Sequence, residues 1–211
     1  MRFLSRVTRH PQDGGTIMYP VEWNNDHEPL YDHKHFQGPL TPQKAKSSCR
    51  HFMGRFTSDY FHIESHPTKT LTVDKIRATL MDKIAQGWIP DVVCVDYADI
   101  LAPPSTTRRF DSRDQINATW EQLRSLSLEF HILLCTATQA TRMGQKADVL
   151  RLEHLSDDKR KAAHVTAMFG INQKDKEKEK GVYRLNVMAR RSGEYCSRNV
   201  VYTASCLAVA N

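Results

Sequence analysis

The stretch that decides the fold is residues 88–101, WIPDVVCVDYADIL. Its middle, DVVCVDY, is a continuous apolar run that contains the carboxylate of Asp96 near its end. A run of this kind is typical of a strand that is buried on both faces. An acid at the end of such a strand is poorly placed for stability and well placed for a ligand, because open α/β sheets bind ligands at the carboxyl ends of their strands.

Helices and strands alternate around this stretch. Residues 70–87, TLTVDKIRATLMDKIAQG, carry apolar residues at spacings of three and four, which predicts one apolar helix face that ends at Gly87. A second helix is expected over about residues 112–130, with Trp120 in its apolar face, and HILLCTATQ is the next buried strand. Such alternation predicts βαβ units and a parallel sheet, with Asp96 and Gln139 close together at its carboxyl edge.

The pattern changes after Gln139. A polar, basic segment leads to a short helix that we expect to begin at Ser156 as its N-cap. Three β-like runs follow, HVTAMFGI, GVYRLNVMA and SRNVVYT, and predict an antiparallel extension of the sheet. The alternating charges of NQKDKEKEKG are typical of a solvated tip, and RRSGEYC predicts a turn around Gly193.

The first 69 residues give weaker signals. TPQKAKSSCRHFMGRF predicts a helix with Thr41 as N-cap, and YFHIES is a candidate strand. The stretch NNDHEPLYDHKHF gathers histidines and an acid, which is a pattern that binds transition metals, but we expect a surface cluster because no second motif completes the site. These residues are His27, Asp32, His33 and His35.

The composition is that of a soluble globular protein. Of 211 residues, 40% are hydrophobic and 26% charged, and the apolar runs are far shorter than the roughly 18 residues of a membrane span. The N-terminus has no apolar signal region, so a cytoplasmic location is expected. A net charge of +6 favours anionic partners such as nucleic acid or nucleotide. The five cysteines show no CxxC spacing, which indicates free thiols in a reducing compartment.

Four segments in this order resemble the RecA-like ATPase core of DnaB-type replicative helicases, particularly phage-associated relatives. PDVVCVDYADIL is similar to the Walker B segment of that family, and LLCTATQATR to its strand ending in a sensor glutamine. LSDDKRKAAHVTAMFGI is similar to the segment before its next core strand, and LNVMARRSGEY to the strand that presents its arginine finger. The resemblance covers about residues 70–203. It implies a partial RecA-like core over residues 70–205, after a divergent segment 1–69 and before a tail 206–211.

The resemblance also implies roles for individual residues. Asp96 corresponds to the acid that holds the Mg²⁺ of bound ATP, and Gln139 to the residue that senses the γ-phosphate. Arg191 corresponds to the finger that reaches the nucleotide of a neighbouring subunit in a ring. The family usually has a lysine where this chain has Ala189, and Arg190 is the candidate to contact the nucleotide in its place, supplying the charge of that lysine but not its geometry.

The resemblance further implies contacts with single-stranded DNA. In the family the basic loop after the sensor glutamine lines the channel of the ring, and Arg142 and Lys146 are the matching residues. Arg108 and Arg109, in the loop beside Walker B, are either further DNA contacts or a solvated surface.

The phosphate-binding motif G-x-x-x-x-G-K-[ST] does not occur in this sequence. We therefore expect a DnaB-like helicase core that is truncated or split, with ATP and Mg²⁺ doubtful for this chain alone. The alternative is a non-catalytic RecA-like module for DNA binding or assembly. Glu22, in TIMYPVEW, is a candidate for the catalytic glutamate of the family, but Pro20 is awkward within a central strand.

Overall fold

The computed structural model describes residues 8, 10–11, 13–26, 28–54, 61–107, 109–157, 159–179, 181–196 and 200–204. The chain divides into two compact units, which are described separately. One comprises Met1–Ile63, Ile171–Leu185 and Val200–Asn211, and the other comprises Glu64–Gly170 and Asn186–Asn199.

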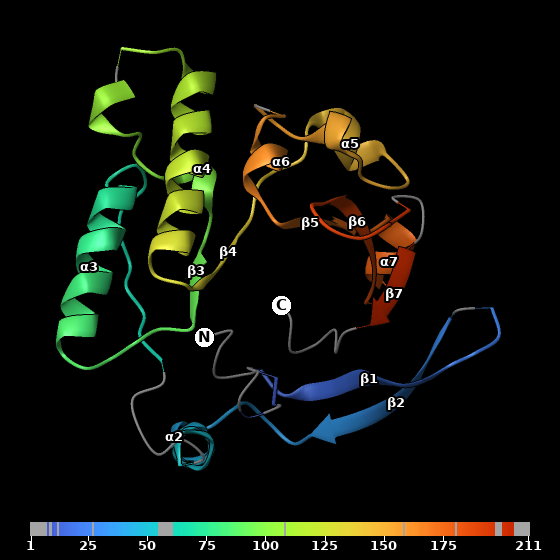
Figure 1. Ribbon diagram of the computed structural model, residues 1–211. Helices are drawn as coiled ribbons and strands as arrows, with labels where there is room; N and C mark the ends of the chain where they lie inside the picture. The colour runs from blue at the N-terminus through green and yellow to red at the C-terminus, as the bar shows by residue number, and fades with distance from the viewer. Residues whose placement is uncertain are drawn as a thin grey trace. The chain divides into compact units, whose positions relative to one another are not determined.

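The second unit is built around a pair of parallel strands and two long helices (Figure 1). In chain order its elements are α3 (Val73–Ala85), β3 (Val92–Val95), η1 (Ala98–Ile100), η2 (Ser105–Thr107), α4 (Ser112–Glu129), β4 (Leu133–Thr136), α5 (Arg142–Lys146), η3 (Leu152–His154) and α6 (Lys161–His164). β3 and β4 pair in parallel, with Cys94 opposite Cys135. The predicted βαβ unit is therefore confirmed.

The two long helices begin at side-chain caps. Thr72 accepts a hydrogen bond from the backbone of Lys75 at the start of α3, and Asp111 accepts one from Asp114 at the start of α4. Such caps satisfy backbone donors that have no partner within the helix. Gly87 follows α3 with a φ of +85°, a conformation that favours glycine, so the predicted stop is confirmed.

The core of this unit lies between the helices and one face of the strands. Leu80 of α3, Trp120 and Leu126 of α4, and Ala98 of η1 are all buried there. Val93, Val95 and Leu134 of the strands pack against this cluster. Trp120 is only 4% exposed, which confirms that it is a core residue.

The opposite face of the strands is open, so the prediction of burial on both faces is wrong. Val92 and Leu133 are 51% and 61% exposed, and Cys94 and Cys135 are exposed as well. Side chains alternate between the faces of a strand, and here one face meets the helices while the other does not. A continuous apolar run does not distinguish these two cases.

The later strands form a three-stranded sheet in the order β5 (Ala167–Asn172), β6 (Val182–Arg190) and β7 (Val200–Ala204). Gln173 donates to the carbonyl of Val182, and Asn172 donates to that of Arg184. Contacts that advance along one strand as they retreat along the other define an antiparallel pair, as predicted. In the described residues these three strands form a sheet of their own, separate from the β3–β4 pair that they were expected to extend. The tip between them is not only solvated loop: it holds α7 (Asp175–Glu179), and Glu177 pairs with the buried Arg184 at 2.7 Å.

Of the two helix N-caps predicted from the sequence, one is confirmed and the other is wrong. Thr41 caps α2 (Pro42–Met53), with Pro42 in its first turn, as expected. Ser156 does not cap α6, because the N-cap of that helix is Arg160 and its side chain makes no capping hydrogen bond. The short polar segment from Ser156 to Arg160 instead leads the chain into the buried Lys161.

The other unit contains an antiparallel hairpin of β1 (Gly15–Trp23) and β2 (Pro29–Phe36). The pairing shifts register between Pro20 and Glu22, which is where a proline is tolerated in a strand. Tyr19 donates to Asp32 at 2.8 Å, and this hydrogen bond lowers the pKa of the Asp32 carboxyl. Of the candidate strand YFHIES, Tyr60 lies outside the described residues, and residues 61–65 have no regular structure. In the part of the chain that the structure describes, no helix has the length and apolar character needed to cross a membrane.

Candidate nucleotide site and its supporting network

The ends of β3 and β4 bring Asp96 and Gln139 into one region. Asp96 directly follows β3, and Gln139 follows β4 by three residues. The Gln139 side chain donates to the hydroxyl of Tyr97 at 2.9 Å, so it is held against the residue next to Asp96. Both Asp96 and Gln139 are exposed, so both are accessible to a ligand at the carboxyl edge of the strands.

Thr136 ties the end of β4 to the turn that follows β3. Its hydroxyl donates to the carbonyl of Val95 at 2.8 Å and accepts from the backbone of Ala98 at 2.9 Å. Because one side chain contacts the backbone on both sides of Asp96, it fixes the path of the chain around that acid.

A buried network lies behind these strand ends, and the sequence did not reveal it. The carboxylate of Asp99 accepts from Trp120 at 3.0 Å and from Thr138 at 2.6 Å. It also pairs with Lys161 at 3.0 Å, and the exposed fractions of the Lys161 and Asp99 side chains are 0% and 8%.

The ammonium group of Lys161 is fully paired. It donates to the hydroxyl of Thr138 at 3.0 Å and to the carbonyl of Ser156 at 3.1 Å, in addition to its contact with Asp99. An ammonium has three donors, and three acceptors surround this one. The nitrogen also lies 5.8 Å from the centre of the Trp120 ring. A buried charge with this many partners holds η1, the segment after β4 and α6 together.

Arg191 is exposed, but its side chain is bound to its own chain. Its Nε donates to the carbonyl of Val165 at 3.1 Å, and its Nη2 donates to that of Ala163 at 2.6 Å. Its backbone N–H donates to Thr166. The neighbouring Arg190 is also exposed, and its guanidinium lies against the turn at Gly193, whose φ is +80°.

The basic loop after Gln139 is closed at its base. The backbone of Thr141 donates to His154, and that of Ser156 donates to Gln139, around a bridge between Ala140 and Leu155. Arg142 and Lys146 mark the two ends of α5 within this loop. Both side chains are exposed, as a contact with DNA requires.

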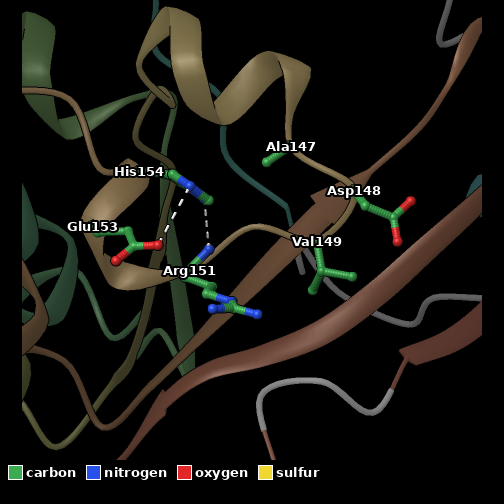
Figure 2. A pocket seen from close by; sticks show the side chains of 6 residues that line it. All are labelled: Ala147, Asp148, Val149, Arg151, Glu153 and His154. Atoms are coloured by element: carbon green, nitrogen blue, oxygen red, sulfur yellow. Dashed lines mark hydrogen bonds and ion pairs between the residues drawn. The ribbon is translucent and has the colours of Figure 1, made fainter.

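A pocket of about 470 Å³ opens beside α5, and Figure 2 shows the side chains that line it. His154 is held there from two sides: its Nδ1 accepts from the backbone of Arg151 at 3.1 Å, and its Nε2 lies 3.7 Å from the Glu153 carboxylate. Gly144 of α5 is packed so closely that an added Cβ would lie 2.7 Å from the Cβ of His154. A side chain at position 144 would therefore push α5 away from the pocket wall.

The remaining predicted residues lie elsewhere or outside the described residues. Arg109 is exposed next to η2, while Arg108 is outside the described part. Glu22 sits on β1, opposite Leu30 of the antiparallel hairpin, and so it is not on a strand of the parallel pair. His33 and His35 are exposed on β2, and His27 lies outside the described residues. The residues that the structure describes contain no group of three side chains arranged to hold a metal ion.

The fold is similar to that of solved helicase and ATPase-domain structures. One solved structure, of a DnaB-like replicative helicase and its interactions with primase, is similar to this chain. It matches 64% of the chain at a TM-score of 0.55 and 15% identity. A second solved structure, an ATPase domain, matches 67% of the chain at a TM-score of 0.57 and 17% identity. The matches cover 32% and 50% of those solved chains.

No protein-family model matches the sequence, and no curated protein matches it. Identities this low establish a common fold and leave the activity open. The comparisons therefore support the architecture predicted from the four segments, while the roles of single residues rest on the chemistry of the site.

Proposed function

We propose that this chain is a DnaB-like helicase ATPase-core protein that takes part in ATP-driven movement along single-stranded DNA, in replication of the phage type. The observation that carries the proposal is the position of Asp96 and Gln139 after adjacent parallel strands, with Gln139 bonded to the residue next to Asp96, in a fold shared with DnaB-like ATPase domains. In this proposal residues 70–205 are the core, and residues 1–69 are a divergent addition.

The side chains at the strand ends fit part of a Mg²⁺–ATP site. The carboxylate of Asp96 makes no hydrogen bond or ion pair with the described residues, so it is available to bind the metal through water. Gln139 is restrained through its amide nitrogen by Tyr97, which leaves its oxygen to orient a water molecule. Bound Mg²⁺–ATP supplies the phosphoryl group for transfer to that water.

The fit is incomplete on the phosphate side. The sequence contains no G-x-x-x-x-G-K-[ST], the loop whose amides and lysine hold the phosphates. Turnover by the proposed site therefore requires a phosphate-binding loop from outside these 211 residues. Arg191 is then proposed to act on the nucleotide of a neighbouring subunit, which requires it to exchange its bonds to Ala163 and Val165 for bonds to phosphate.

The test is steady-state phosphate release with Mg²⁺, ATP and single-stranded DNA. The chain alone is expected to show no substantial turnover. Assembled with a P-loop-containing DnaB-type subunit, it should support hydrolysis, and Asp96→Asn should reduce the rate a hundredfold or more. The matched control is Asp91→Asn, an exposed acid at the other end of β3, which should have no effect.

Two results would overturn this assignment. Robust turnover by the chain alone, abolished by Asp96→Asn, would show a complete phosphate site within these residues. Equal rates for wild type and Asp96→Asn in the mixed assembly would show that Asp96 plays no part in the chemistry.

A second candidate function is a non-catalytic RecA-like module that binds DNA or docks on a helicase. It is favoured by the missing phosphate loop and by the bonds that tie Arg191 to its own chain. DNA binding through Arg142 and Lys146 to phosphates should weaken steeply as salt rises and depend little on base sequence. Removing those two charges should weaken binding more than removing Lys176 and Lys178 of α7, where Asp175 and glutamates offset the positive field.

A further inference from the structure

The open face of β3 and β4 carries two cysteines side by side. Cys94 and Cys135 are opposite one another in the parallel register, and both are free thiols and exposed. Since residues paired in register on parallel strands point to the same face, both sulfurs project from the open side of the layer. Neither residue takes part in the nucleotide site described above.

The pairing in register places the two thiols next to each other. Because Cys94 and Cys135 are opposite one another and point to the same face, their sulfurs can reach one ligand. Partial burial is the main cause that raises the pKa of the Cys135 thiol, and the neighbouring Cys94 raises this pKa further.

We propose that Cys94 and Cys135 form a two-thiolate binding site for a soft monovalent cation of the Cu(I) class. This inference does not rest on the proposed ATPase function. Thiolates are ligands that select Cu(I) and other soft metals. On binding, the two thiols release two protons and the cation forms two sulfur–metal bonds, with no change of oxidation state.

The spacing of the strands suits a bridging cation. Adjacent strands lie about 4.7–4.9 Å apart. A metal–thiolate bond is about 2.3 Å long, as for zinc, so a linear sulfur–metal–sulfur unit spans about 4.6 Å, which is close to the strand spacing.

The number of ligands favours Cu(I) over Zn²⁺. Structural zinc sites almost always use four protein ligands. Among the described residues, no third histidine, cysteine or acid joins this pair in a group that could hold a metal. A cation that is satisfied by two thiolates fits this pair, and a tetrahedral cation does not.

The experiment is a competition for Cu(I) between the reduced full-length chain and the chromophoric chelator bicinchoninate, under argon. The wild-type chain should retain one Cu(I) per molecule. Cys94→Ser and Cys135→Ser should each lower the affinity a hundredfold or more, because one thiolate remains. Cys49→Ser and Cys196→Ser are the controls and should bind as the wild type does.

A second measurement uses the wild-type chain alone and so does not depend on folding of the variants. Cu(I) should protect Cys94 and Cys135 from alkylation, located by mass spectrometry, and should leave Cys49 reactive. Zn²⁺ at the same concentration should protect neither. The proposal is overturned if the wild type fails to retain Cu(I), if Cys94→Ser binds it unchanged, or if Cu(I) protects Cys49 and the pair alike.

Discussion

The two faces of the β3–β4 pair are made of the same kinds of residue and have opposite surroundings. On one face Val93, Val95 and Leu134 pack against α3 and α4. On the other, Val92 and Leu133 are mostly exposed and the two cysteines lie open. Position relative to the helices, and not hydrophobicity along the chain, determines how much each side chain contributes to stability.

The helix-covered side also carries the polar network at the strand ends, which gives it a second role. Apolar packing of α4 holds Trp120 in the core, and the same Trp120 donates to Asp99. Asp99 in turn binds Thr138, the residue before Gln139. Contacts on the packed face therefore connect the apolar core to the residue before Gln139, whereas the open face carries the thiol pair.

The largest expected effect on the packed side is at Lys161. Lys161→Met should destabilise the chain by about 3–5 kcal/mol, because it leaves the buried Asp99 carboxylate without its cation. The measurement is the free energy of unfolding in urea. Lys159→Met, an exposed lysine two residues earlier, is the control and should stay within about 0.5 kcal/mol.

The double variant Asp99→Asn with Lys161→Met makes this prediction sharper. It removes both charges, so it should recover much of the stability that Lys161→Met loses. If Lys161→Met is as stable as Lys159→Met, the network does not hold the strand ends, and the packed face has no special relation to the site.

Substitutions on the two faces of β4 should differ in their effect on the free energy of unfolding, and the larger effect should be intermediate in size. Leu134 and Leu133 are adjacent on β4, but Leu134 packs against the core and Leu133 is 61% exposed. Leu134→Thr should cost about 1–3 kcal/mol, since it places a hydroxyl and a smaller side chain against the core. Leu133→Thr should change the free energy of unfolding by less than about 0.5 kcal/mol, since threonine suits an exposed strand position.

Equal losses at these two positions would show that another part of the protein covers the open face in solution. In that case the thiols of Cys94 and Cys135 should also resist alkylation in the folded chain. The two measurements together therefore decide whether the difference between the faces is real.

The sequence was sufficient for the elements whose signals are local. The helical spacing and caps of α3 and α4 were readable, because each depends on residues within one or two turns. The position of Asp96 and Gln139 after two paired parallel strands was also predictable, since adjacent parallel strands end at the same edge. These inferences need no knowledge of what packs against the elements.

The sequence was not sufficient where a partner lies far along the chain. Lys161 is charged and sits in a polar segment, so nothing local distinguishes it from a surface lysine. Its burial depends on Asp99 and Thr138, which lie in the segments that follow β3 and β4. The open face was missed for a related reason: an apolar run looks the same whether one face or both are covered.

The smallest expected effect on stability is at the adjacent residues Arg190 and Arg191. They allow a side chain that is held by hydrogen bonds to backbone carbonyls to be compared with one that lies against a turn. Both are exposed; Arg191 donates to the carbonyls of Ala163 and Val165, while Arg190 lies against the turn at Gly193. Arg190→Ala should leave the free energy of unfolding within about 0.5 kcal/mol.

Arg191→Ala should cost slightly more, roughly 0.5–1 kcal/mol, because hydrogen bonds at an exposed site are partly replaced by water.

Hydrolysis by an assembly with a P-loop-containing subunit then distinguishes a structural role of Arg191 from a role as an arginine finger. A finger residue stabilises transition-state charge, and its loss lowers turnover by roughly 10³–10⁵. If Arg191→Ala lowers hydrolysis a hundredfold or more while Arg190→Ala has a smaller effect, Arg191 leaves its carbonyl partners to act on the neighbouring nucleotide. If the mixed assembly forms and both variants hydrolyse ATP at the wild-type rate, Arg191 serves only to fasten the end of β6 to the segment after α6, and the non-catalytic module becomes the better account of this chain.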